Sequence, residues 1–93
     1  MADKPTTDYL AVIFVSCGGG SWGRSPDKHK AIANAVRIYR ADWGKIAKIK
    51  KGDEVAVNVV DVAPHDTVWW DARGFWVGDV KLDRPIEVVR HII

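Results

Sequence analysis

Two kinds of hydrophobic pattern occur along this chain, and together they predict its secondary structure. Apolar residues are nearly continuous in two segments, which is typical of buried strands. These segments predict strands over Asp8–Cys17 and Val55–Val62. Three shorter segments are rich in β-branched and aromatic residues and are separated by turn residues, so they predict further strands: Thr67–Asp71, Phe75–Leu82 and Ile86–Ile92.

One segment has the helical period instead. Its apolar residues recur three or four positions apart, which places them along one face of a helix: Ile32, Ala35, Val36, Tyr39 and Trp43. Ser25 suits the N-cap position and Pro26 the first helical position, while Gly44 suits the C-cap. The pattern predicts a helix over Pro26–Trp43. The glycine-rich segment Gly18–Arg24 before it is expected to be a loop, because successive glycines weaken both helix and strand.

The predicted order of elements, β-α-β-β-β-β, indicates an α+β fold. Only the first connection contains a helix, so only the first two strands are candidates for parallel pairing. We therefore expect a single helix packed on one face of a mostly antiparallel, twisted sheet. Residues 1–7 are expected to form a flexible tail and residues 8–93 a single domain. The residues expected to be buried are Ile13, Ile32, Val36, Tyr39 and Val57.

The tryptophans suggest where a partner would bind. The chain contains five of them among 93 residues, and tryptophan and arginine carry much of the binding energy at protein interfaces. Trp69 and Trp70 are consecutive in a predicted strand, so they must point to opposite faces of the sheet. Because one helix covers one face, the other face is expected to be open. We predict a partner-binding surface made of Trp69, Trp70, Arg73 and Trp76, covered by a protein partner or by a second copy of this chain.

The glycine-rich segment offers an alternative function. Backbone N–H groups of a glycine-rich turn and of a helix N-terminus attract anions when they point to the same place. The residues that would bind a phosphorylated ligand or a nucleotide are Gly19, Gly20, Trp22, Arg24 and Lys28. The simpler interpretation is a loop whose glycines permit a sharp turn.

A third interpretation comes from a resemblance. The segment FVSCGGGSWGRSP, residues 14–26, resembles the active-site loop of low-molecular-weight protein tyrosine phosphatases. The resemblance implies that Cys17 is a nucleophile, that the loop amides cradle phosphate and that Arg24, Ser25 and Pro26 open the helix. Six residues separate Cys17 from Arg24 here, where the family pattern has five, and no Asp-Pro general acid follows late in the chain.

Basic residues at the end of the predicted helix form a candidate nucleic-acid-binding set, because clustered lysine and arginine bind phosphates: Arg37, Arg40, Lys45, Lys48 and Lys51. The alternative is a solvated surface. The net charge of +2 does not by itself indicate a nucleic-acid partner. The three histidines lack the spacing of a metal site, so no metal or cofactor is predicted.

These observations favour a small non-enzymatic binding protein that occupies a surface on a macromolecular partner. In size and composition the chain is similar in class to accessory or inhibitor proteins of phages and mobile elements, including those that block host defence complexes. A single cysteine excludes an internal disulfide and suits a reducing compartment, so a cytoplasmic location is expected. No apolar run approaches the roughly 20 residues that span a bilayer, and no membrane partner is predicted.

Overall fold

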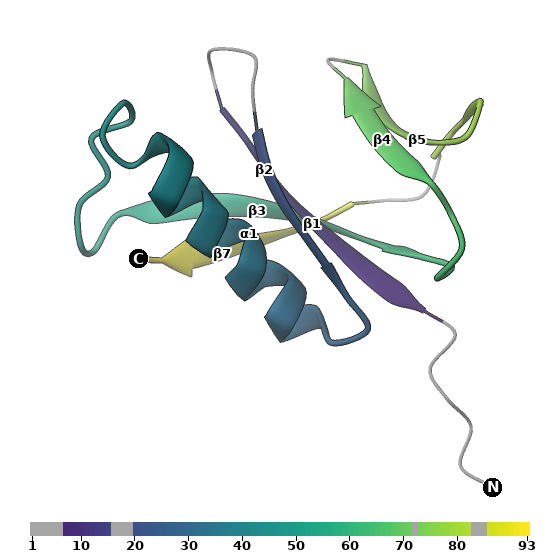
Figure 1. The fold of residues 1–93 in the computed structure, drawn as a ribbon, viewed down its shortest axis with the longest axis horizontal. Coiled ribbons are helices and arrows are strands. Elements are labelled where there is room, and N and C mark those ends of the chain that lie inside the picture. Colours follow the sequence, from purple (N-terminus) through teal and green to yellow (C-terminus); the bar gives the residue numbers. More distant parts are fainter. Residues whose placement is uncertain (1–6, 16–19, 72, 83–85) are drawn as a thin grey trace, which may run out of the picture.

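The computed structural model describes residues 7–15, 20–71, 73–82 and 86–93. In this part of the chain one helix packs against antiparallel sheets (Figure 1), which confirms the predicted α+β class. A four-stranded sheet has the order β2-β1-β3-β7, and a three-stranded sheet has the order β4-β5-β6. The elements are β1 (Asp8–Phe14), β2 (Gly20–Ser25), α1 (Lys28–Trp43), β3 (Glu54–Val62), β4 (Val68–Asp71), β5 (Gly74–Val77), β6 (Val80–Lys81) and β7 (Glu87–Ile92). Apart from Thr7, the predicted tail lies outside the described residues.

Two strands were not predicted. The expected strand Phe75–Leu82 is divided by a turn at Gly78, which has a φ of 57°, so β5 and β6 form a tight hairpin. Strand β2 occupies most of the segment that was expected to be a loop. Its residues pair antiparallel with β1, from Phe14 opposite Gly20 to Tyr9 opposite Ser25. Because β2 reverses the chain before the helix, β3 returns antiparallel to β1, so the two strands that were candidates for parallel pairing are antiparallel neighbours.

Helix α1 begins two residues later than predicted. Asp27, not Ser25, is the N-cap: its side chain accepts hydrogen bonds from the backbone N–H groups of His29 and Lys30. Ser25 instead accepts a bond from the Asp27 backbone N–H, upstream of the helix. Gly44 is the C-cap, as predicted, but it is right-handed, with a φ of −55°. The chain leaves helical geometry further on, where Lys48 has a positive φ of 52°.

The first hydrophobic core lies between α1 and the four-stranded sheet. Ile32 and Val36 are buried as predicted, together with Ile13 and Val57, whereas Tyr39 is only half-buried at the edge of this core. Gly23 on β2 allows the helix to approach closely, since a Cβ atom there would lie 2.3 Å from the carbonyl oxygen of Ala31. The described part of the chain has no helix whose length and hydropathy would allow it to cross a membrane.

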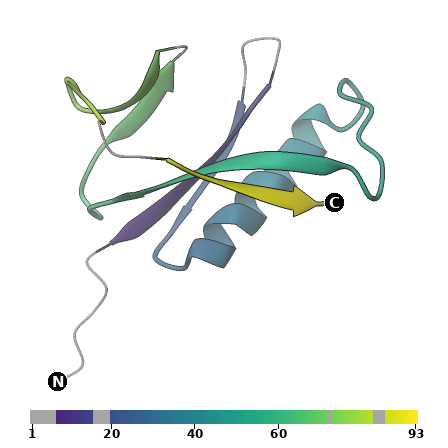
Figure 2. The ribbon, with the colours of Figure 1, turned by 180° about the vertical axis from the view of Figure 1, so that it is seen from behind.

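A second core covers part of the opposite face, so the expectation of an open face is wrong for that part. The chain after β3 folds back as the three-stranded sheet, and Phe75 is buried against the four-stranded sheet. The buried residues of this core are Leu10, Val12, Val60, Val62 and Phe75. Viewed from behind, the half of the sheet near the C-terminus, formed by β3 and β7, is not covered by the small sheet (Figure 2). Val88 and Ile92 are exposed there.

Candidate functional site

The hairpin of β4 and β5 carries an exposed stack of aromatic side chains. Trp69 and Trp76 lie opposite each other in the two strands, and their rings are stacked with centroids 5.1 Å apart and an angle of 6° between planes. The guanidinium carbon of Arg73 lies 5.2 Å from the centroid of the Trp76 ring, within the range of a cation–π interaction. We call Trp69, Trp76 and Arg73 the tryptophan ladder. Trp69 is 40% exposed and the Arg73 side chain 72%, so the ladder is open to a partner.

Asp71 holds the ladder in place. Its Oδ1 atom accepts a 2.8 Å hydrogen bond from the Arg73 backbone N–H and a 3.2 Å bond from Nε1 of Trp76. Its Oδ2 atom accepts bonds from the Arg73 guanidinium at 3.1 and 3.3 Å. The bond from the Arg73 backbone is the largest cause that keeps the pKa of Asp71 below its ordinary value of 3.8, and the side chains of Trp76 and Arg73 act in the same direction.

Both indole N–H groups of the ladder are used inside the protein. Nε1 of Trp69 donates to the carbonyl oxygen of Gly78 at 2.9 Å, and Nε1 of Trp76 donates to Asp71. These bonds fix the orientation of each ring. What the ladder offers outward is therefore the apolar surface of two rings and one guanidinium group.

Trp70 belongs to the opposite face of the hairpin, as its position beside Trp69 requires. It packs on the second core, where its ring meets Trp22 of β2 at a centroid distance of 6.4 Å and Phe75 at 6.3 Å. The structure thus brings together three of the four residues predicted to bind a partner. It places Trp70 between the two sheets.

Of the described residues predicted to bind an anion, Trp22 and Arg24 line one small hollow of about 200 Å³, and Gly20 and Lys28 do not line it. Gly19 lies outside the described residues, and Gly20 and Trp22 are strand residues. Arg24 is held by its own protein: its guanidinium donates to Asp8 at 3.1 Å and to the carbonyl oxygens of Ala63, Pro64 and Asp66. Lys28 forms an ion pair with Glu87 of β7.

The helix N-terminus is also distant from Gly20, the first described glycine of the glycine-rich segment. Strand β1 ends and β2 begins at one end of the sheet, whereas β2 leads into α1 at the other end (Figure 1). Gly20, at the start of β2, and the N-terminus of α1 therefore lie at opposite ends of this strand. Cys17, the nucleophile implied by the phosphatase resemblance, lies outside the described residues.

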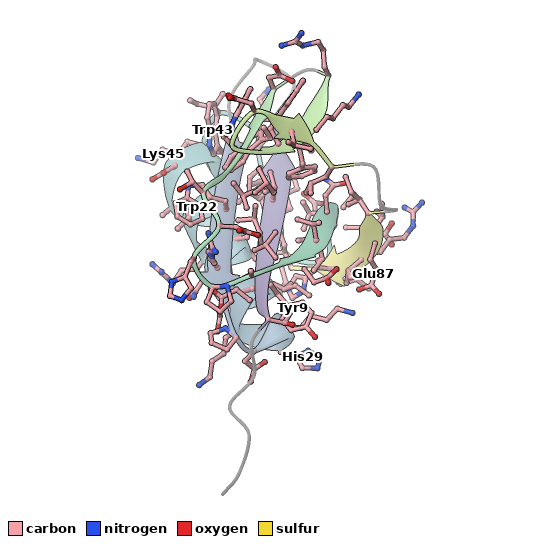
Figure 3. The ribbon with its side chains drawn as sticks, turned by 90° about the vertical axis from the view of Figure 1, so that its right-hand side faces the viewer. Tyr9, Trp22, His29, Trp43, Lys45 and Glu87 are labelled. Atoms are coloured by element: carbon pink, nitrogen blue, oxygen red, sulfur yellow. The ribbon has the colours of Figure 1, made fainter. Side chains whose placement is uncertain are left out.

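The basic residues are divided between two surface hollows. Arg40 and Lys45 line a hollow of about 560 Å³ at the end of α1, together with Lys50 and Lys51. Figure 3 shows Lys45 at this end of the helix, near Trp43. Arg37 lines a second hollow, which it shares with Arg40 and His91. Lys48 is exposed and lines neither.

Asp71 and Gly78 were not predicted to belong to the site. From the sequence, Asp71 is expected only to end a strand. In an Asx turn, the side chain of an aspartate accepts a hydrogen bond from the backbone N–H two residues later. The sequence therefore contained a signal for the bond between Asp71 and Arg73. The Gly78 carbonyl oxygen accepts from Trp69 because the turn at Gly78 separates β5 from β6. The hydrophobic pattern of the sequence did not predict this turn. Over the described ranges, no three histidine, cysteine, aspartate or glutamate side chains are grouped so that they could hold a metal ion.

No protein-family model, no curated protein and no solved structure matches this chain. The geometry of the ladder is therefore the basis for a functional assignment.

Proposed function

We propose that this chain is a small non-enzymatic interaction protein whose tryptophan ladder binds a surface of a protein partner. The observation that carries this proposal is the exposed stack of Trp69 on Trp76, capped by Arg73. Tryptophan and arginine are enriched among the residues that contribute most to protein binding. A large exposed aromatic surface is also unusual for a protein that acts alone.

The rigidity of the ladder supports the same function. Binding usually costs free energy because flexible side chains must be ordered at the interface. Here the rings are already held by hydrogen bonds to Asp71 and Gly78. A partner therefore meets a preformed surface, and an apolar or anionic counterpart suits its rings and guanidinium.

The test is to capture binding partners with the wild-type chain and with Trp69→Ala, and to identify both proteins and nucleic acids that co-purify. A stoichiometric protein should be lost or strongly reduced with Trp69→Ala, because truncation of a central interface tryptophan costs about 2 kcal/mol or more of binding free energy. Trp43→Ala is the matched control, since Trp43 lies at the end of α1, away from the hairpin. Equal capture by Trp69→Ala and the wild type would contradict the proposal.

A second candidate function is contact with nucleic acid at the end of α1. The observation that favours it is the hollow of about 560 Å³, which is lined by Arg40, Lys45, Lys50 and Lys51. Binding through these cations would weaken steeply with salt, since it releases counterions from the phosphates. Titration of a labelled oligonucleotide at several salt concentrations, with Lys45→Ala as the variant, distinguishes this function from binding at the ladder.

A further inference from the structure

Strand β7 forms an edge of the four-stranded sheet, with β3 on its other side. Ile93 N donates to the Asp53 carbonyl oxygen at 2.9 Å, in the register that pairs β7 with β3. Backbone groups of an antiparallel strand point alternately to its two sides. Those of Val88, Arg90 and Ile92 therefore face away from β3, and none of the described strands pairs with them. Open edges of this kind are sites where a second chain adds to a sheet.

The two ends of β7 carry opposite charge on the side of the sheet that faces the helix. At its start, two carboxylates, Glu87 and Asp61, line a hollow of about 340 Å³ with Tyr9 and with one lysine, Lys28, the ion-pair partner of Glu87; Figure 3 labels Tyr9 and Glu87 on this part of the surface.

At the end of β7, His91 lines a hollow of about 510 Å³ with Arg37 and Arg40 of α1. An identical strand that runs in the opposite direction brings each acidic end to a basic end.

We propose that β7 pairs antiparallel with β7 of a second copy of this chain, about a two-fold axis that passes beside Val89. In this register Glu87 of each copy lies opposite His91 of the other, and the two Val89 residues lie opposite each other. The bonded pairs join Val88 to Arg90, whose backbone groups both face the open edge.

Two other registers that use the outward backbone groups are poorer. Pairing Arg90 with Arg90 of the second copy places like charges directly opposite each other, which destabilises a strand pair. Pairing Arg90 with Ile92 shortens the contact to the last residues of the strand. The register about Val89 also matches Ile86 with Ile92, which is 68% exposed in the single chain.

The oligomeric state of the intact chain tests the proposal, measured by sedimentation equilibrium over a range of concentrations. A reversible dimer is expected. His91→Glu should weaken it about tenfold, because it places two carboxylates opposite each other at both ends of the interface. The double variant Glu87→Lys, His91→Glu restores opposite charges and should restore dimerisation.

A cysteine variant tests the register itself. In a Cys17→Ser background, Val89→Cys should form a disulfide between copies under mild oxidation, since residues opposite each other at a non-bonded pair have Cα atoms about 4.5 Å apart. Val88→Cys is the matched control. Position 88 of one copy lies opposite Arg90 of the other in this register, so the two introduced thiols do not meet and no disulfide is expected.

A chain that remains monomeric at all concentrations overturns the proposal, as does a dimer that neither responds to His91→Glu nor cross-links through position 89. Capture of another protein's strand at β7 in place of a second copy also overturns it. The proposal is independent of the proposed function, so Trp69→Ala should leave the dimer intact. Loss of the dimer in that variant would show that two copies associate through the tryptophan ladder and not through β7.

Discussion

Asp71 connects two residues of the tryptophan ladder through a single carboxylate. Its oxygens accept from the Arg73 backbone, the Arg73 guanidinium and the Trp76 indole, all of which are donors. A protonated carboxyl group is a poorer acceptor and carries no charge to hold the guanidinium. The arrangement of the ladder therefore depends on the ionised form of this one side chain.

This dependence predicts a pH response at the residue scale. The pKa of Asp71 is lowered in the folded chain, so its contribution to stability is fully present above the ordinary value of 3.8 and is lost as the pH falls through the lowered value. Acidification below 3.8 should weaken the exciton signal that two stacked indoles give in far-ultraviolet circular dichroism.

Asp71→Asn removes the titrating group, so its exciton signal should be weaker at neutral pH and should lack the transition due to this carboxyl. Asp79→Asn is the control, since Asp79 is an exposed aspartate in the neighbouring turn. Identical acid transitions in Asp71→Asn and the wild type would show that another group governs the ladder.

At the scale of elements, Gly23 determines how closely α1 lies on β2. A Cβ at this position would lie 2.3 Å from the Ala31 carbonyl oxygen and 2.8 Å from the Ala35 backbone nitrogen. These are helix backbone atoms, which cannot rotate away as the end of a side chain can. Gly23→Ala should therefore lower the free energy of unfolding by about 2 kcal/mol through overpacking, measured by denaturant titration.

Gly78→Asn is the control for this substitution. Gly78 has a φ of 57°, and a Cβ atom added there would have nothing within 4 Å of it. Asparagine tolerates that backbone conformation better than other residues with a side chain, so the stability of this variant should change little. A stable Gly23→Ala variant would mean that the helix can shift away from β2 at small cost.

The helix and the principal strands could be predicted from sequence because each has a strong period. The stripe that contains Ile32 and Val36 fixes the face of α1, and the apolar run Val55–Val62 fixes β3. Strand β2 was missed because its glycines favour a turn on intrinsic grounds. The alternation of buried Ser21, exposed Trp22 and buried Gly23 is a property of the folded strand, and the sequence does not show it as an alternation of apolar and polar residues.

The part of the candidate site that depends on pairing within the hairpin of β4 and β5 could be predicted from the sequence. A two-residue hairpin connection that pairs Asp71 with Gly74 also places Trp69 opposite Trp76, and consecutive residues of a strand must face opposite sides. The location of Trp70 was not predictable, because it depends on a tertiary event: the hairpin folds over the second face of the four-stranded sheet instead of joining its edge.

At the scale of the whole molecule, Arg24 ties the two sheets together. Its guanidinium bonds to Asp8 of β1 and to the carbonyl oxygens of Ala63, Pro64 and Asp66, which lie in the connection from β3 to β4. Arginine donates in several directions at once, whereas the ammonium group of lysine acts as a compact charge. The side chains of Arg24 and Asp8 are 23% and 16% exposed, so this ion pair is largely shielded from water, whereas the bonds to Ala63 and Pro64 are exposed.

Arg24→Lys should therefore lower the free energy of unfolding by about 2 kcal/mol and should make the hairpin of β4 and β5 more sensitive to limited proteolysis. Arg37→Lys, on the exposed face of α1, provides the comparison. If both variants are as stable and as protease-resistant as the wild type, the two sheets are held by their apolar contacts alone.

Strand β1 contributes buried residues to both hydrophobic cores. Leu10 and Val12 are buried under the small sheet, and Ala11 and Ile13 are buried under the helix. The three-stranded sheet can detach from the four-stranded sheet without exposing the core under α1. It can pack again only when β1 is already paired in the four-stranded sheet. Any ligand that binds the ladder only when the hairpin is closed will shift this opening equilibrium. Binding of such a ligand would then slow hydrogen exchange of the backbone amides in the second core, at residues that the ligand does not contact.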